Sequence, residues 1–287
     1  MKPSKNKAAS IFLLLFFLFR SASYSQSQQN EISKSEFDRV LYSHSHFSFT
    51  ISPYIVNKAK AIPLSGSYHL NSIYMYGFEG GTDYHSRFSR TTSAIIGFHG
   101  GLAARNYKLF ISKNDFTPNL QYDFIANGAL TREYDFYICI PLLYEKRWFT
   151  KNNNYWDAFG GINVRFYPAP KENVVDQTEI YQDANGNQSV ILELDYALGN
   201  NNIPWLNYNI GGGYTMLLSN NNFLCFNLVA NFSNTKLVNG TYTINVDGKP
   251  ESTGTYSANL SYVGLSFSYI LTGANKRMRK FYESRLK

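Results

Sequence analysis

From Phe47 onward, apolar and polar side chains alternate along the chain with a period of two residues. Between residues 47 and 56, Phe47, Phe49 and Ile51 are apolar, and the residues between them are polar. This periodicity is typical of β-strands whose two faces meet different surroundings. The pattern predicts eight strands, which span residues 47–56, 73–85, 93–111, 134–148, 155–167, 205–218, 223–238 and 255–272.

The connections between the predicted strands alternate in length. They contain 16, 7, 22, 6, 37, 4 and 16 residues, so every long connection is followed by a short one. Outer-membrane barrels have long extracellular loops and short periplasmic turns, which gives this alternation. The sequence therefore predicts an all-β protein, an eight-stranded antiparallel up-and-down transmembrane β-barrel over residues 47–272. If the N-terminus starts in the periplasm, the long connections are extracellular.

The polar faces of the predicted strands carry charges and small residues. In a membrane barrel these faces line the lumen, and buried charges there need partners of opposite charge. Glycine and alanine on the same faces leave room for the arginines in a narrow interior. The predicted lumen charge network consists of Glu79, Asp83, His99, Arg105, Asp135, Glu145, Arg147, Asp157 and Arg165. The same periodicity also fits a soluble protein with its apolar faces inside.

Two positions interrupt the regular alternation. The apolar positions change parity between Tyr262 and Val263, and a one-residue β-bulge in the last strand would restore the apolar face. Pro141 lacks an amide hydrogen inside a strand that a closed barrel cannot leave at an edge. We expect a bulge or a locally open ladder at this proline.

The two ends of the chain predict export and a periplasmic location for both termini. Residues 1–25 combine a lysine-rich start with the nine-residue apolar stretch 11–19, as in a secretory signal peptide. Residues 26–46 form a predicted periplasmic segment. Residues 273–287 form a basic tail with a net charge of +5. We expect this tail to lie near anionic headgroups or an acidic partner. Residues 26–272 carry a net charge of −2, which argues against nucleic-acid binding.

Few residues are candidates for catalysis or metal binding. His99 lies deep in a predicted strand, where Glu79, Asp83 or Asp157 could give it an acid–base partner. Paired lumen charges are nevertheless expected in any small barrel, so we predict no catalytic residue, no metal site and no cofactor. The two cysteines, Cys139 and Cys225, lie on non-adjacent strands and are expected to be free thiols.

The longest connection, residues 168–204, is acidic. Its net charge is −5, and residues 183–187 read as the tip of a hairpin. An exposed acidic hairpin suits contact with divalent ions or a basic partner, or simply aids solubility. The acidic residues of this predicted extracellular loop are Glu172, Asp176, Glu179, Asp183, Glu193 and Asp195.

Two segments resemble a known family. The segment 137–148, with the sequence Ile-Pro-Leu-Leu, and the glycine-rich segment 158–168, which ends in Tyr-Pro, are similar to the PorT-like outer-membrane β-barrel proteins. The resemblance covers about residues 47–272. It implies an eight-stranded barrel in the outer membrane of a Gram-negative cell, without catalytic residues that could be transferred. The family's namesake takes part in protein secretion and gliding, but no residue here singles out that role.

These observations favour a non-enzymatic barrel in outer-membrane lipid that anchors an assembly or presents loops for interaction, with a protein partner at the basic tail or at the extracellular loops. One alternative is a barrel enzyme acting on lipid or peptide, which would depend on His99 and a carboxylate. Another is a soluble periplasmic ligand-binding barrel. A diffusion pore is less favoured, because eight strands filled by paired charges leave little channel.

Overall fold

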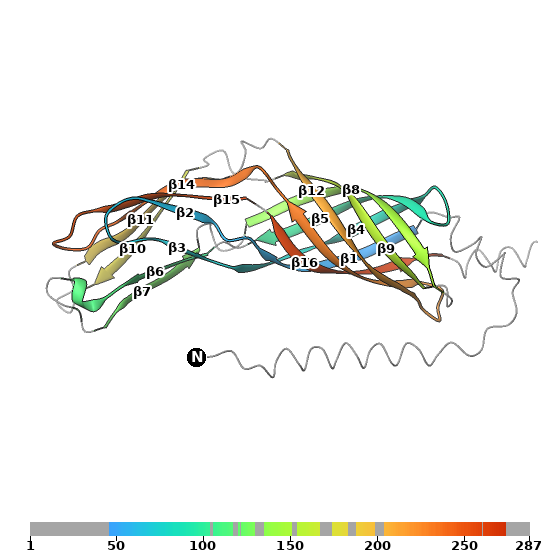
Figure 1. The fold of residues 1–287 in the computed structure, drawn as a ribbon, viewed down its shortest axis with the longest axis horizontal. Coiled ribbons are helices and arrows are strands. Elements are labelled where there is room, and N and C mark those ends of the chain that lie inside the picture. The colour runs from blue at the N-terminus through green and yellow to red at the C-terminus, as the bar shows by residue number, and fades with distance from the viewer. Residues whose placement is uncertain are drawn as a thin grey trace, which may run out of the picture.

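Eight antiparallel strands close into a barrel, which confirms the predicted fold (Figure 1). The computed structural model describes residues 46–103, 106–116, 120, 122–129, 135–150, 154–166, 174–182, 188–198, 204–259 and 261–273. Strands that follow one another around the barrel are hydrogen-bonded neighbours, in the order β1-β16-β13-β12-β9-β8-β5-β4. Their bounds are β1 His46–Val56, β4 Met75–Arg87, β5 Thr92–Ala103, β8 Asp135–Phe149, β9 Tyr155–Phe166, β12 Trp205–Leu217, β13 Phe223–Phe232 and β16 Tyr262–Leu271.

The barrel has its apolar side chains outside and its polar side chains inside. In β1, for example, Phe49 is 57% exposed, whereas the next residue, Thr50, is 6% exposed. This polarity is opposite to that of a water-soluble barrel and fits a hydrocarbon environment. The exposed apolar belt therefore defines a transmembrane barrel. No helix in the described ranges is long and apolar enough to cross a membrane.

The long connections are not loops, because they contain strands that form two further sheets beyond one end of the barrel (Figure 1). We call these two sheets the cap, and the barrel end beside them the cap end. The end with the short turns is the turn end. The five-stranded sheet has the order β10-β11-β14-β15-β2, with bounds Val174–Gln182, Gln188–Leu198, Lys236–Ile244, Ser252–Asn259 and Lys60–Ser65. The three-stranded sheet has the order β3-β6-β7, with bounds Asn71–Ile73, Asn106–Ile111 and Phe124–Ala129, and a short 3-10 helix spans Lys113–Asp115.

The cap has a hydrophobic core of its own. Leu192 of β11 and Tyr242 of β14 belong to the same buried cluster as Leu109 and Ile111 of β6. The two sheets thus bury their apolar faces against each other, as in a β-sandwich. Unlike the barrel, the cap has an apolar interior.

Three predicted strands are wrong in extent, because each one joins a barrel strand to a cap strand. The predicted strand 93–111 is β5 followed by β6, and 223–238 contains β13 and the start of β14. The predicted strand 255–272 contains the end of β15 and all of β16. Strands in the barrel and in the cap both have one apolar face, so the alternation alone does not show where the chain leaves one sheet for another.

The predicted bulge between Tyr262 and Val263 is also wrong. The register of β16 against β1 is the same from Leu271 to Tyr262. The parity changes because the chain passes here from the cap into the barrel. In β15 the apolar residues Tyr256 and Ala258 face a core, whereas in β16 the apolar residues Val263 and Leu265 face outward.

The ladder is locally open at Pro141, as expected. β8 pairs with β5 on both sides of Pro141 in one register, but the positions opposite Ile140 and Pro141 are unpaired. On its other edge β8 pairs with β9 throughout, including Pro141 with Asn163. The barrel therefore tolerates the missing amide hydrogen without a bulge.

We predict that Leu192→Ala destabilises the cap by roughly 2–5 kcal/mol, the usual range for a leucine truncated in a core. Leu192 is fully buried in the cap core, whereas the neighbouring Glu193 is exposed. Limited proteolysis should cut the cap of Leu192→Ala faster while the barrel remains protected. The matched control, Glu193→Ala, should behave like the wild type. Equal protection of the cap in both variants would contradict the assigned core.

Candidate functional site in the barrel lumen

Most residues of the predicted lumen network lie inside the barrel. Arg105 lies outside the described residues, and Asp135 is the first residue of β8, with a side chain that is not described. The remaining members of the network are buried: Glu79, Asp83, His99, Glu145, Arg147, Asp157 and Arg165. They form one group near the cap end and another near the turn end.

Arg165 of β9 is the centre of the group near the cap end. Its Nη2 donates to Glu79 Oε2 at 2.9 Å and to the hydroxyl of Tyr262 at 3.1 Å. Its guanidinium carbon lies 4.6 Å from the ring centroid of Tyr137 and 5.2 Å from that of Tyr262. Tyr137 also donates to Glu79 at 2.8 Å, and the hydroxyls of Tyr54 and Tyr137 lie 2.8 Å apart. This layer of one arginine, one glutamate and three tyrosines fills the lumen.

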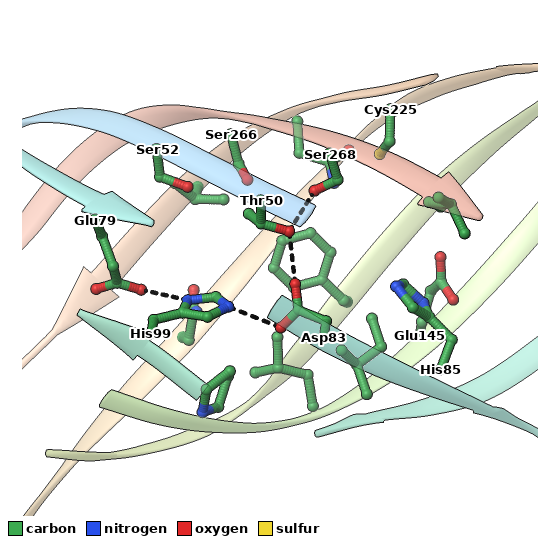
Figure 2. A pocket seen from close by; sticks show the side chains of 18 of the residues that line it. Thr50, Ser52, Glu79, Asp83, His85, His99, Glu145, Cys225, Ser266 and Ser268 are labelled. Carbon is green, nitrogen blue, oxygen red and sulfur yellow. Dashed lines mark hydrogen bonds and ion pairs between the residues drawn. The ribbon is translucent and has the colours of Figure 1, made fainter. Parts of the chain in front are cut away.

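His99 of β5 links this layer to the middle of the lumen (Figure 2). Its Nδ1 lies 3.0 Å from Glu79 Oε1, and its Nε2 lies 2.8 Å from Asp83 Oδ1. Asp83 also accepts from Thr50 Oγ1 at 2.6 Å, and Thr50 contacts Ser268 at 2.8 Å. Carboxylates only accept hydrogen bonds, so His99 donates from both ring nitrogens and acts as the cation between two acids.

Arg147 of β8 is the centre of the group near the turn end. Its Nε donates to Glu145 Oε2 at 3.0 Å and its Nη2 to Ser93 Oγ at 2.6 Å. Ser93 donates in turn to Glu145, and the Arg147 guanidinium lies 5.4 Å from the ring centroid of Tyr155. Tyr155 packs in a buried cluster with Phe223 and Ile270 at the turn end of the barrel.

A cavity of about 70 Å³ lies between the two groups. Its lining includes Asp83, His85, His99 and Glu145 (Figure 2). A buried water needs roughly 10–15 Å³ of such space and two to four polar partners, so the cavity suits a few waters. It has no room for a drug-sized ligand.

Asp157 of β9 differs from the other lumen carboxylates. It accepts from Thr215 Oγ1 at 2.8 Å and weakly from Cys225 Sγ at 3.8 Å. Among the described residues it forms no ion pair, and its Oδ1 has no hydrogen-bond partner. Cys225 and Cys139 are free thiols, as predicted.

The tyrosines of the layer around Arg165 are not among the residues predicted from the sequence. Tyr54 follows Ser48, Thr50 and Ser52 on the even, inward positions of β1, and Tyr137 shares the inward parity of Cys139. An aromatic residue on an otherwise polar face was the available signal. Glycines make space for these rings: a Cβ at Gly101 would lie 2.1 Å from Tyr137 Cζ, and one at Gly77 would lie 2.0 Å from Tyr54 Cε2.

The predicted acidic loop forms part of the cap sheet, as the hairpin β10–β11. Glu193 and Asp195 of β11 are exposed, and Asp176 lies in β10 with a side chain that is not described. Glu172 and Asp183 lie outside the described residues. Glu179 is half-buried and accepts from the Tyr107 hydroxyl at 2.6 Å. Burial and this hydrogen bond raise the pKa of Tyr107, so the phenol stays a donor between the two cap sheets.

His99, the catalytic candidate from the sequence, has no free ring nitrogen in the lumen. A general base needs a free nitrogen or oxygen within reach of a substrate proton. Both nitrogens of His99 already face carboxylates, and the residue is buried. Among the described residues, no group of three histidine, cysteine or acidic side chains is arranged to hold a metal ion. The contacts instead pair charges with one another.

Comparison with known proteins gives no family assignment. No model of a known protein family matches the chain, and no curated protein matches it. Among solved structures, the outer membrane protein OprG from Pseudomonas aeruginosa is similar over 79% of this chain and 96% of its own, with 8% identity and a TM-score of 0.38. The β domain of the Bordetella autotransporter BrkA is similar over 79% of this chain and 98% of its own, with 11% identity and a TM-score of 0.21.

We predict that Arg165→Met destabilises the barrel by about 3–5 kcal/mol, because it leaves the buried Glu79 without its cation. Denaturant unfolding of the detergent-solubilised protein, followed by tryptophan fluorescence, measures this change. The double variant Glu79→Gln/Arg165→Met removes both charges and should recover most of the lost stability. If the double variant is as unstable as the single one, packing rather than charge pairing explains the role of Arg165.

Proposed function

We propose that this protein is a non-enzymatic outer-membrane barrel that holds its cap outside the cell as a surface for interaction. The observation that supports this function best is the contrast between the two parts of the molecule. The barrel exposes an apolar belt and has charged side chains in its lumen, whereas the cap buries an apolar core of its own and exposes the acidic residues Glu193 and Asp195. A filled barrel serves as an anchor, and a folded domain on the four long connections serves as the part that meets a partner.

The proposed role is not that of a diffusion pore. The layer around Arg165 and the layer around Arg147 each occupy the lumen with fully buried side chains. The cavity between them, at about 70 Å³, holds only a few waters. An ion crossing the barrel would have to break the ion pairs Arg165–Glu79 and Arg147–Glu145.

The rival role as a barrel enzyme has less support. His99 was its best candidate, and the two carboxylates that hold the ring leave no nitrogen free for a substrate proton. The polar groups around it line the small lumen cavity, which has no room for a drug-sized substrate. The lumen network is therefore better explained as the structural filling of a narrow barrel.

The sidedness of the cap is part of the proposal. With a periplasmic N-terminus, β1 runs outward and the cap lies on the cell surface. The acidic hairpin β10–β11 then suits a basic protein partner outside the cell. Of the basic tail, residues 273–287, all but Gly273 lies outside the described residues, and its periplasmic partner also remains a prediction. So does the similarity to the PorT-like proteins, and with it any role in secretion.

We expect the protein to remain with the cell envelope after washing with high salt or carbonate, and to need detergent for extraction. A protease added to intact cells should cut within the cap but not within the barrel, because the belt of residues such as Phe49 and Leu228 lies in lipid. Release by mild lysis would instead support the soluble periplasmic alternative. Protection of the cap on intact cells, with cleavage after lysis, would reverse the proposed sidedness.

We also expect no large, steady conductance when the purified protein is inserted into planar bilayers, because both arginine layers close the lumen. A variant that removes both layers, Glu79→Ala/Arg165→Ala/Glu145→Ala/Arg147→Ala, tests whether the barrel itself can conduct. Channel activity in this variant but not in the wild type would identify these layers as the barrier. Large steady conductance of the wild type would contradict the anchor function.

A further inference from the structure

One charged side chain lies on the outer face of the barrel. Across the outward positions of the eight strands, within the part of the chain that the structure describes, every residue is apolar or uncharged except Lys146 of β8. Lys146 lies between Tyr144 and Trp148, which point outward on the same strand and are both more than half exposed. A lysine on a lipid-facing surface is unfavourable away from the membrane interface, so its position needs an explanation.

Short side chains flank Lys146 on both neighbouring strands. Lys146 pairs with Thr92 of β5 on one side and with Ala158 of β9 on the other. Two residues closer to the turn end, Trp148 pairs directly with Trp156, and both rings are exposed. Tryptophan is enriched where the hydrocarbon meets the headgroups. Lys146 thus lies just inside an aromatic band, beside two positions that offer no steric obstacle.

The ammonium group of Lys146 is directed to the turn end. Its Nζ donates to Thr91 Oγ1 at 3.3 Å, and Thr91 is held there because its carbonyl accepts from the Arg147 amide at 2.8 Å. An ammonium has three donors, and only this one is used within the described residues. Lys146 forms no ion pair with any carboxylate in those residues.

A second cation adjoins this position. Arg90 precedes Thr91 in the turn between β4 and β5, is exposed, and has its guanidinium carbon 4.7 Å from the ring centroid of Phe149, the last residue of β8. The short connections 88–91, 150–154 and 218–222 contain no aspartate or glutamate. These short connections therefore add cations but no carboxylate to the rim near β8.

We propose that Lys146 and Arg90 form a binding site for an anionic phospholipid headgroup in the leaflet at the turn end. This inference rests on the proposed membrane location. The lipid phosphate would accept from the remaining ammonium donors and from the guanidinium, while the acyl chains lie against Tyr144 and the paired tryptophans. A lipid fits better than a protein partner, because Lys146 lies deeper than Trp148 on a face that only lipid covers.

The three tryptophans of the chain provide the test. Trp148 and Trp156 flank the site, whereas Trp205 is 2% exposed inside the barrel and gives a background that lipids do not reach. The full-length protein is reconstituted in phosphatidylcholine vesicles that contain 10–20% phosphatidylglycerol, with bromine on the acyl chains of one lipid at a time. Quenching of fluorescence then reports which lipid lies beside the site.

We expect the quenching to show that phosphatidylglycerol is enriched beside the site about fivefold over its mole fraction in the vesicle. This ratio corresponds to the attraction of one cation for an anionic headgroup. Lys146→Gln should lower the enrichment towards one, Lys146→Arg should retain it, and high salt should weaken it. The control Lys60→Gln changes an exposed lysine of the cap and should leave the enrichment unchanged. Unfolding of each variant checks that the barrel is intact.

The outcomes separate this site from the proposed function. If brominated phosphatidylcholine quenches the wild type but phosphatidylglycerol shows no enrichment, or if Lys146→Gln keeps the full enrichment, the headgroup site is wrong and the membrane barrel stands. If neither brominated lipid quenches, the barrel does not lie in the bilayer and the proposed function fails. If Lys146→Gln unfolds in neutral vesicles, Lys146 has a structural role and the lipid site is wrong.

Discussion

The structure depends on one constraint: in hydrocarbon, every backbone hydrogen bond must be made within the protein. Eight strands satisfy this only by closing, so β1 pairs with both β4 and β16 and leaves no open edge. Closure then decides where side chains lie. The apolar positions face lipid. The alternate positions face a narrow lumen, which their side chains fill.

The filling of the lumen follows from that confinement. A buried charge is stable only with a partner, so the interior is organised as pairs and bridges. Arg165 meets Glu79, Arg147 meets Glu145, and His99 lies between two acids. Tyrosine rings stack against Arg165 and glycines leave room for the rings, which makes the cap end of the lumen a packed layer. This filling favours a barrel that anchors over one that conducts.

The cap, in the same chain, has its apolar side chains inside. Its two sheets bury Leu109, Leu192 and Tyr242 against each other and leave Glu193 and Asp195 exposed, as water requires. The chain passes between barrel and cap only at the cap-end rim, and the parity change between Tyr262 and Val263 marks one such passage. Lys146 lies near the opposite rim, where an outward cation can reach the headgroups.

The sequence by itself determined the barrel, because strict alternation and the long–short connections have one common explanation in a closed membrane sheet. The inward positions of Glu79, His99 and Arg165 also followed from parity. Only the tertiary structure decided which charges meet, since pairing across the lumen depends on strand tilt and register rather than on spacing along the chain. It also decided that the long connections form a cap. An apolar face looks the same in sequence whether lipid or a second sheet covers it.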